Sequence, residues 1–221
     1  MNKNLLQVTV DGSHTILSET FDVTYHSKNG AITESNVVFI DAGLNYFNSD
    51  STSNISIFEM GFGTGLNAFL SCLWAESNKI LIQYHAVEAF PVSLKMIQEL
   101  NYPDILGNAE IFQNIHSVPW EQNQKITPFF QINKENIKIE DYCAQSLFDI
   151  VFYDAFGPGT QPHLWDIPTL TKMYNLLVPN GILVTYCAQG AFKRNLRDVG
   201  FYVENIPGPP GKREITRAIK K

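Results

Sequence analysis

From residue 55 to the C-terminus, short apolar runs alternate with longer amphipathic segments. The apolar runs predict strands at 55–60, 80–88, 126–132, 148–153, 182–186, 201–206 and 212–219. The amphipathic segments predict helices at about 65–76, 92–100, 139–146, 168–177 and 189–199. Residues 111–113 form a weaker strand candidate. Strands that alternate with helices predict an α/β fold, in which a mostly parallel sheet is covered by helices on both faces.

The first 47 residues follow a different pattern, in which strand signals predominate. The strand candidates lie at 6–10, 14–17, 19–27 and 37–40. Asp11-Gly12, between the first two candidates, is a typical hairpin signal. We therefore predict a small β-rich appendage at residues 1–50 and one main domain at residues 51–221.

The first strand of the main domain ends in a glycine turn, Glu59-Met-Gly-Phe-Gly-Thr-Gly-Leu-Asn67. Its glycines allow positive φ angles and a close approach of the backbone to a ligand. The dinucleotide fingerprint G-x-G-x-x-G requires a third glycine at position 66, where this chain has Leu66. The turn therefore favours a nucleotide-like ligand and disfavours a nicotinamide dehydrogenase. A glycine turn that only joins a strand to a helix is the alternative.

Two acidic residues stand at the ends of predicted strands. Glu88 ends the second strand of the main domain, 25 residues after Gly63. In doubly wound folds a carboxylate at that place accepts hydrogen bonds from ribose hydroxyls. Asp154 follows the strand 148–153, and ligands of open parallel sheets lie beyond the carboxyl ends of the strands. We therefore expect Asp154 beside the glycine turn.

Charge and composition exclude some classes of protein. The net charge of −6 argues against a generally basic nucleic-acid binder, but residues 193–221 hold eight Lys and Arg against three Asp and Glu. Such a segment can meet phosphates or can be ordinary solvated surface. The three cysteines have no metal-ligand spacing, and no apolar run approaches the roughly 20 residues of a membrane helix. With no signal-peptide pattern at the N-terminus, we expect a cytoplasmic protein without a metal or a membrane partner.

The spacing E-x-G-x-G-x-G resembles the first motif of class I S-adenosylmethionine (SAM) methyltransferases. In that family the glycine loop lies under the methionine part of SAM, and the acidic residue helps to hold it. The last two predicted strands resemble the antiparallel hairpin that ends the sheets of this family. The resemblance implies a Rossmann-like fold with SAM as cofactor. The predicted cofactor contacts are Tyr25, Glu59, Gly61, Phe62, Gly63, Thr64, Gly65, Asn67, Glu88, Phe90, Glu135 and Asp154.

A longer series of segments resembles the methyltransferase domain of the MnmC family of tRNA-modifying enzymes, in a stand-alone form. These segments lie at 21–27, 38–40, 58–67, 88–91, 154–158, 164–165, 179–181, 185–186, 193–196, 200–201 and 211–214. The resemblance implies methylation of the primary amine of 5-aminomethyl-2-thiouridine at the tRNA wobble position, which gives 5-methylaminomethyl-2-thiouridine. Bifunctional members carry a second, flavin-dependent domain. Because this sequence ends at Lys221, we expect the methylation alone.

The same resemblance gives roles to residues near the predicted cofactor. Asp154 can orient the amine and accept its proton, since only the neutral amine attacks; alternatively, it holds SAM or caps the loop. Tyr186, a second catalytic candidate, and Phe156 can stack on an extruded uracil ring, or they can belong to the core. The predicted contacts to tRNA phosphates, which can equally be solvated surface, are Lys193, Arg194, Lys212 and Arg213.

One departure from the family concerns the adenine side of the cofactor. Relatives commonly carry a Gly-Asp pair after the third strand, where this chain has Asn133-Lys-Glu135. Glu135, displaced by one residue, is the candidate replacement, and Asn136 or backbone groups are alternatives.

Two other functions fit the same residues. The first is a SAM-dependent methyl- or aminopropyltransferase that acts on a small amine, since spermidine synthases share an N-terminal β-rich appendage and acidic residues around the pocket. The second is a non-catalytic domain that binds SAM or RNA. A requirement for intact tRNA would exclude the first, and turnover would exclude the second.

Overall fold

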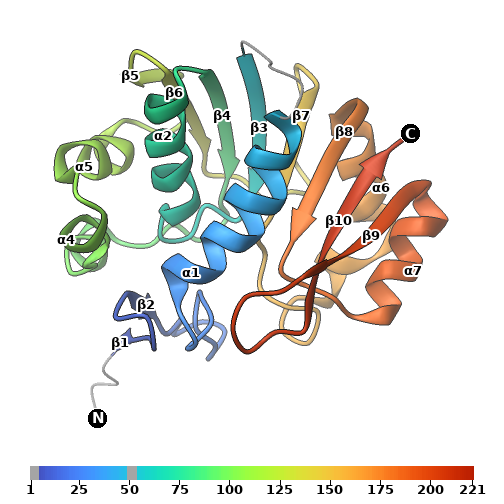
Figure 1. Ribbon diagram of the computed structural model, residues 1–221, viewed down its shortest axis with the longest axis horizontal. Helices are drawn as coiled ribbons and strands as arrows, with labels where there is room; N and C mark the ends of the chain where they lie inside the picture. The colour runs from blue at the N-terminus through green and yellow to red at the C-terminus, as the bar shows by residue number, and fades with distance from the viewer. Residues whose placement is uncertain (1–4, 49–53) are drawn as a thin grey trace.

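The computed structural model describes residues 5–48 and 54–221 (Figure 1). Its centre is an eight-stranded sheet in the order β5-β6-β4-β3-β7-β8-β10-β9. The strands are β3 (Asn54–Met60), β4 (Leu81–Val87), β5 (Gln124–Thr127), β6 (Phe130–Glu135), β7 (Phe148–Tyr153), β8 (Leu177–Thr185), β9 (Phe201–Pro207) and β10 (Glu214–Lys220). The five strands from β6 to β8 are parallel, whereas β5, β10 and β9 are antiparallel to their neighbours. The predicted mostly parallel sheet and its C-terminal hairpin are confirmed.

Helices cover both faces of this sheet. The elements on or beside the first face are α1 (Ala31–Ser35), η1 (Asn36–Asn45), α2 (Leu66–Asn78), α3 (Leu94–Ile97), α4 (Tyr102–Leu106) and α5 (Ala109–Ser117). Those on the second face are η3 (Pro162–Trp165), α6 (Ile167–Leu176) and α7 (Gly190–Val199). On β7, Ile150 and Phe152 pack on the first face, and Val151 and Tyr153 on the second. Because both faces are buried, the strand is apolar almost throughout.

The N-terminal region combines a small sheet with a long helix. Strands β1 (Leu6–Val8) and β2 (His14–Ile16) form the predicted antiparallel hairpin. The prediction of a strand at 37–40 was wrong, because these residues lie in η1, which continues α1 and crosses in front of β3 and β7 (Figure 1). A four-residue apolar run does not by itself distinguish a buried strand from a buried helix.

The helix α1–η1 belongs to the core of the main sheet. Val38, Phe39 and Leu44 are buried on it, and the Phe39 ring lies 5.0 Å from that of Phe152 on β7. The predicted boundary between residues 50 and 51 lies outside the described residues, so the division into an appendage and a main domain stays a prediction.

Four other predicted elements differ from the structure. Residues 19–27 form turns and bends in place of a strand, and they pair with the hairpin only through an isolated bridge between Thr24 and Leu17. Residues 111–113 lie in α5, because Phe112, Ile115 and His116 are buried together at helical spacing. The single strand predicted at 126–132 is a hairpin of β5 and β6. Residues 139–146 form turns and bends in place of a helix. There the Lys172 ammonium donates hydrogen bonds to the backbone carbonyl oxygens of Ile139 and Glu140, each at 2.7 Å, and to that of Tyr142 at 3.1 Å.

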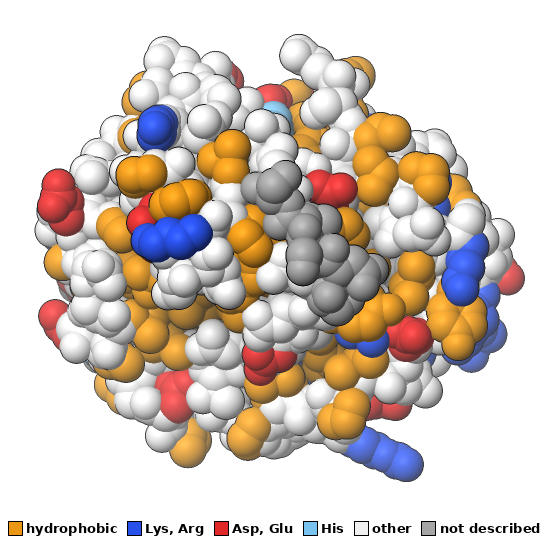
Figure 2. Space-filling model, turned by 45° about the horizontal axis from the view of Figure 1, so that its top comes forward, with side chains coloured by type: hydrophobic (Ala, Val, Ile, Leu, Met, Phe, Trp, Pro, Cys, Tyr) orange, Lys and Arg blue, Asp and Glu red, His pale blue; other side chains and the backbone are white. Residues whose placement is uncertain are grey.

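The parallel strands start at one edge of the sheet and end at the opposite edge. Figure 2 looks toward the edge at which β3 begins, and lysine, arginine and acidic side chains are interspersed on this face. The carboxyl ends of the strands lie at the other edge, beside the segment that connects β2 to α1 (Figure 1). That edge holds the site described below.

The burial of η1 gives a test of its place in the core. Replacement of Phe39 by alanine should lower the free energy of unfolding by about 3–5 kcal/mol, because it opens a cavity against Phe152. The neighbouring exposed residue gives a matched control, and Asp41→Ala should change the same quantity by less than about 1 kcal/mol. Urea denaturation measures both. Equal effects of the two substitutions would contradict the packing of η1 on the sheet.

Candidate functional site

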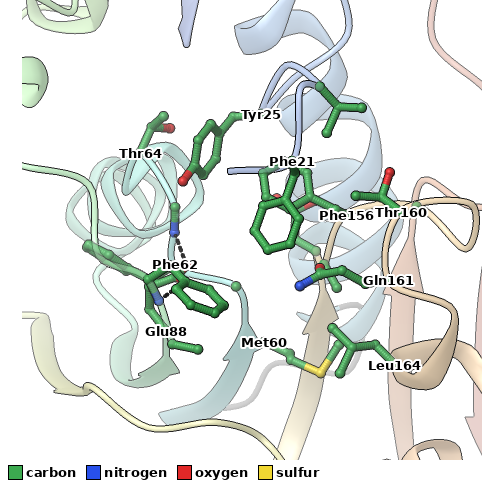
Figure 3. A pocket seen from close by; sticks show the side chains of 18 of the residues that line it. Phe21, Tyr25, Met60, Phe62, Thr64, Glu88, Phe156, Thr160, Gln161 and Leu164 are labelled. Atoms are coloured by element: carbon green, nitrogen blue, oxygen red, sulfur yellow. Dashed lines mark hydrogen bonds between the residues drawn. The ribbon is translucent and has the colours of Figure 1, made fainter. Parts of the chain in front are cut away.

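A pocket of about 530 Å³ opens at the carboxyl ends of β3, β4 and β7. The pairing of these strands explains its position, because Met60 at the end of β3 is in register with Val87 of β4 and Tyr153 of β7. The residues that follow the three strands therefore meet at one place. They are the glycine turn, Glu88 and Asp154, as the sequence predicted. Figure 3 shows Phe62 and Thr64 of the turn together with Glu88.

The backbone of the glycine turn excludes side chains. Gly61, Gly63 and Gly65 have φ angles of 95°, 50° and 71°, a region that side chains rarely adopt. A Cβ atom on Gly61 would lie 2.6 Å from the carbonyl oxygen of Asp154, and one on Gly63 would lie 3.0 Å from the Tyr25 ring. A Cβ atom on Gly65 would lie 2.6 Å from the His116 ring, outside the pocket. Gly65 thus serves packing on α5, whereas Gly61 and Gly63 line the pocket.

Glu88 holds the turn and lines the pocket. Its Oε2 accepts a hydrogen bond from the backbone N–H of Gly63 at 3.0 Å, and its Oε1 accepts one from that of Phe90 at 2.8 Å. Burial raises the pKa of the Glu88 carboxyl, and the backbone donors oppose that shift. Each carboxylate oxygen retains acceptor capacity toward the pocket. This arrangement fits the predicted acceptor of ribose hydroxyls.

Asn67 connects two carboxyl groups. Its Nδ2 donates to Asp154 Oδ2 at 2.8 Å and to Glu59 Oε1 at 2.9 Å. Asp154 lines the pocket, but Glu59 is fully buried behind Asn67 and is not part of the pocket wall. The alternation along β3 turns Glu59 toward α2, so the structure does not support its predicted direct contact with SAM. Burial raises the pKa of Glu59 well above its ordinary value.

Asp154 is poised to exchange a proton near neutral pH. Burial raises the pKa of its carboxyl to about 7; the charges of Glu34 and Glu88 act in the same direction. The Asn67 hydrogen bond and the Lys212 charge oppose the shift. A carboxyl with such a pKa can take a proton from a reacting group at neutral pH.

Aromatic side chains form the opposite part of the pocket wall. The ring of Phe156 lies 5.0 Å from the rings of both Phe21 and Tyr25, which come from the segment between β2 and α1 (Figure 3). The Tyr186 hydroxyl donates to the carbonyl of Ala155 at 2.8 Å, and Phe90 is 49% exposed at the pocket. Phe156 and Tyr186 therefore both lie at the pocket wall. The predicted contacts Phe62 and Thr64 line it as well.

Several predicted contacts lie elsewhere. Glu135 Oε1 lies 3.1 Å from His85 Nε2, and Glu135 is not among the pocket residues, so the structure does not support it as the adenine-side acid. Lys193 is buried, and its ammonium pairs with Glu214 at 2.7 Å, so it is not placed to contact tRNA phosphates. Arg194 and Arg213 are exposed outside the pocket.

Other wall residues were not predicted. They include Phe21, Glu34, Ile137, Ile139, Gln161 and Leu164. Ile137 and Ile139 follow β6 and give the pocket an apolar wall just after Glu135. Phe21 lies in segment 21–27, which is part of the family resemblance, so the sequence contained a signal that could have identified it as a site residue. No such signal existed for Glu34, because its burial depends on helix α1, and the sequence predicted a β-rich region there.

The pocket fits the cofactor that the sequence suggested. Its carboxylates and its glycine backbone suit the hydroxyl and amino groups of SAM, and its apolar residues suit the adenine ring. Within residues 5–48 and 54–221, no cluster of three or more His, Cys, Asp and Glu could hold a metal ion. Among the same residues, no helix is long and apolar enough to cross a membrane.

The close contact at Gly61 gives a test of the cofactor site. Gly61→Ala should weaken SAM binding at least tenfold, because the new methyl group would push the turn away from Asp154. Gly107→Ala is the matched control: Gly107 also has a positive φ angle, 74°, but a Cβ atom there meets nothing within 4 Å. Calorimetric titration with SAM measures both affinities. Equal affinities for the two variants would mean that the cofactor binds elsewhere.

Sequence comparisons find similarity to MnmC proteins. The chain is 28% identical to the tRNA 5-methylaminomethyl-2-thiouridine biosynthesis bifunctional protein MnmC of Leptospira borgpetersenii over 91% of its own length and 33% of the relative's. The MnmC protein of Marinomonas sp. is 29% identical over 90% of this chain and 31% of its own. The chain thus spans about a third of the length of these relatives.

Two solved structures show the fold. The crystal structure of MnmC2 from Aquifex aeolicus superposes with a TM-score of 0.79 at 23% identity, and the match covers 98% of this chain and 69% of that one. Spermidine synthase from Thermotoga maritima superposes with a TM-score of 0.55 at 10% identity, over 100% of this chain and 70% of its own. The first shares nearly the whole fold described here.

A model of the S-adenosyl-L-methionine-dependent methyltransferase family matches residues 93–221, which is more than half of the chain. The matched part includes Asp154, Tyr186 and the C-terminal hairpin, and the glycine turn that precedes it lines the same pocket. The chain therefore belongs to the family of S-adenosyl-L-methionine-dependent methyltransferases.

Proposed function

We propose that this chain methylates the primary amine of 5-aminomethyl-2-thiouridine at the wobble position of tRNA and forms 5-methylaminomethyl-2-thiouridine. The observation that carries the proposal is the position of Asp154, a half-buried carboxyl with a pKa of about 7 that lines the same pocket as the glycine turn. The names of the similar MnmC proteins supply the nucleoside. A cytoplasmic location fits a tRNA substrate.

Different residues of the pocket have different roles in the proposed reaction. Gly61, Gly63 and Glu88 would hold SAM, which supplies an electrophilic methyl group on its sulfonium when bound. Methyl transfer is an in-line displacement, so catalysis depends mainly on the position of the amine. Asp154 orients the amine, and its carboxylate accepts the proton that the amine loses.

Asn67 supports Asp154 in this role. Its donated hydrogen bond holds one oxygen of the Asp154 carboxyl group, Oδ2, and Asp154 lines the pocket. The amide stabilises the ionised form of Asp154 against the burial that raises the pKa. Asn67 is therefore a positioning residue for the proposed base.

The aromatic wall suits an extruded base. Phe156 and Tyr186 line the pocket, and uracil rings that leave the helical stack pack on aromatic rings of this kind. The Lys212 ammonium lies over one face of Tyr186, 4.2 Å from the centre of its ring. The exposed Arg194 and Arg213 remain the proposed contacts to the anticodon-stem phosphates. Charges of both signs are interspersed on the face in Figure 2, whereas the pocket opens at the opposite edge of the sheet.

The pKa of Asp154 predicts the pH dependence of the reaction. The carboxylate is the active form, so kcat/KM should rise as the pH increases through about 7. Asp154→Asn should remove this step and lower kcat/KM by about 100-fold or more, the usual contribution of a general base. The SAM dissociation constant should stay within about threefold, because Glu88 and the glycine turn still hold the cofactor. Asp104→Asn, at an exposed carboxylate on α4, serves as the control.

Steady-state methylation between pH 5.5 and 9 measures this profile. If Asp154→Asn keeps both its rate and the step near pH 7, Asp154 is not the proton acceptor. In that case the residue only holds SAM or the turn.

The substrate itself is tested by methyl transfer from labelled SAM. The acceptor is tRNA from cells that make the aminomethyl uridine but cannot methylate it, and tRNA from cells that lack the aminomethyl group is the control. Mass spectrometry of the nucleosides should show 5-methylaminomethyl-2-thiouridine only with the first tRNA. SAM binding without transfer to either tRNA would refute the proposal.

A small amine is the second candidate substrate. The carboxyl groups of Glu34, Glu88 and Asp154 line the pocket and would attract a free polyamine. The fold similarity to spermidine synthase fits this alternative but does not favour it over a nucleoside. Methylation of free aminomethyl nucleoside or putrescine at rates equal to those with tRNA would support it.

A further inference from the structure

Glu34 and Lys212 meet at the pocket wall from opposite ends of the chain. Glu34 lies in α1 and is only 8% exposed, and Lys212 lies in the turn between β9 and β10. The Lys212 ammonium and the Glu34 Oε1 form an ion pair. Lys212 therefore faces into the pocket, in contrast to the phosphate contact that the sequence suggested.

Both partners are fixed by further contacts. The second carboxylate oxygen of Glu34 accepts a hydrogen bond from the backbone N–H of Ser27 at 3.0 Å. The Lys212 ammonium lies 4.2 Å from the centre of the Tyr186 ring, a cation–π geometry. The Tyr186 hydroxyl in turn donates to Ala155, the residue after Asp154. A continuous series of contacts thus runs from the N-terminal segment to the proposed base.

The pair also contributes opposite charges next to Asp154. Glu34 raises the pKa of Asp154 and Lys212 lowers it, so their effects oppose each other. The other titratable groups that line the pocket are Tyr25, His26, Glu88, Lys138, Glu140 and His163. Of the two described lysines on this wall, Lys138 is exposed and Lys212 is half-buried, so Lys212 supplies the interior cation.

We propose that Glu34 and Lys212 form a positioning pair for the amine acceptor. Glu34 holds the Lys212 ammonium over the face of Tyr186, and together the two residues balance the charge beside Asp154. The inference rests on the proposed function for its acceptor, an amine, but it assigns two residues that neither the family match nor the sequence joined. A lone ammonium at this place would repel an incoming cationic amine, whereas a lone carboxylate would hinder the ionisation of Asp154.

The first test measures the titration of Asp154 without any substrate. Carboxyl-carbon NMR of aspartate-labelled protein follows the pKa in the wild type, in Glu34→Gln, in Lys212→Gln and in the double variant, with Asp154→Asn to assign the signal. Lys212→Gln should raise this pKa and Glu34→Gln should lower it, each by about 0.5 or more. The double variant, which restores the balance, should lie close to the wild type.

Two substitutions at exposed positions provide matched controls. Glu110→Gln and Lys125→Gln remove one charge of each sign far from the pocket and should leave the pKa of Asp154 unchanged. If Lys212→Gln does not fold because Glu34 is left buried without its partner, the other two variants decide: the pKa must be higher in the double variant than in Glu34→Gln. Equal pKa values of Asp154 in those two proteins would refute the proposed positioning pair.

The second test uses the methylation of tRNA. Glu34→Gln should raise the KM for the aminomethyl tRNA by about three- to tenfold, because the Lys212 ammonium would then repel the cationic amine through partly screened solvent. The SAM affinity should change little. The double variant should recover most of this loss. A variant that merely lost packing would not recover when a second contact is removed, so equal losses in both proteins would refute the role in acceptor binding.

The two tests separate the pair from the proposed function. If the wild type does not methylate the aminomethyl tRNA, the proposed function fails, but the NMR titration still decides whether Glu34 and Lys212 balance the charge beside Asp154. If the wild type is active and the titrations do not move, the pair is refuted and the function stands.

Discussion

The side-chain amide of Asn67 binds two carboxyl groups at the place where β3 and β7 end, and the architecture of the pocket depends on it. Glu59 behind it and Asp154 in front of it would repel each other if both were ionised in so little water. The amide donates to both, so the strand ends and the start of α2 stay in contact. Burial and the neighbouring carboxylates leave Asp154 with a pKa of about 7, which suits a proton acceptor.

The parallel sheet provides the frame for this arrangement. Three neighbouring strands end in register, so the glycine turn, Glu88 and Asp154 converge although they lie far apart in the chain. The turn then serves as a backbone wall, because its glycines leave no Cβ atoms at the contacts with Asp154 and Tyr25. A cofactor and an acceptor can therefore share one pocket of about 530 Å³.

The N-terminal segment completes the site and is part of the core. Helix η1 is packed against the sheet through Phe39, and the residues before it bring Phe21, Tyr25 and Glu34 to the pocket. The ion pair of Glu34 with Lys212 then joins the first forty residues to the C-terminal hairpin across the acceptor side. This contact makes the two ends of the chain interdependent at the place where the substrate is proposed to bind.

The sequence by itself determined the α/β class, most of the sheet and the centre of the site. Short apolar runs identified the buried strands. The glycines and acidic residues that follow the predicted strand ends identified Gly61, Gly63, Glu88 and Asp154 as candidate site residues. These signals are local, since each depends on residues close together in the chain. Only the tertiary structure decided that residues 37–40 are helical, because a short apolar run satisfies the burial needs of either element.

The partners of charged side chains were likewise decided by the tertiary structure. Glu59 follows the acidic family pattern, but the alternation of β3 and the position of α2 put it behind Asn67. Lys193 and Lys212 look alike in a basic C-terminal segment, yet Lys193 is buried and pairs with the half-exposed Glu214, whereas Lys212 pairs with Glu34 at the pocket. Lys212 and its partner Glu34 are 178 residues apart in the sequence, and no local sequence pattern predicts a contact between residues so far apart. The sequence thus fixes which groups are present, and the fold determines which of them meet.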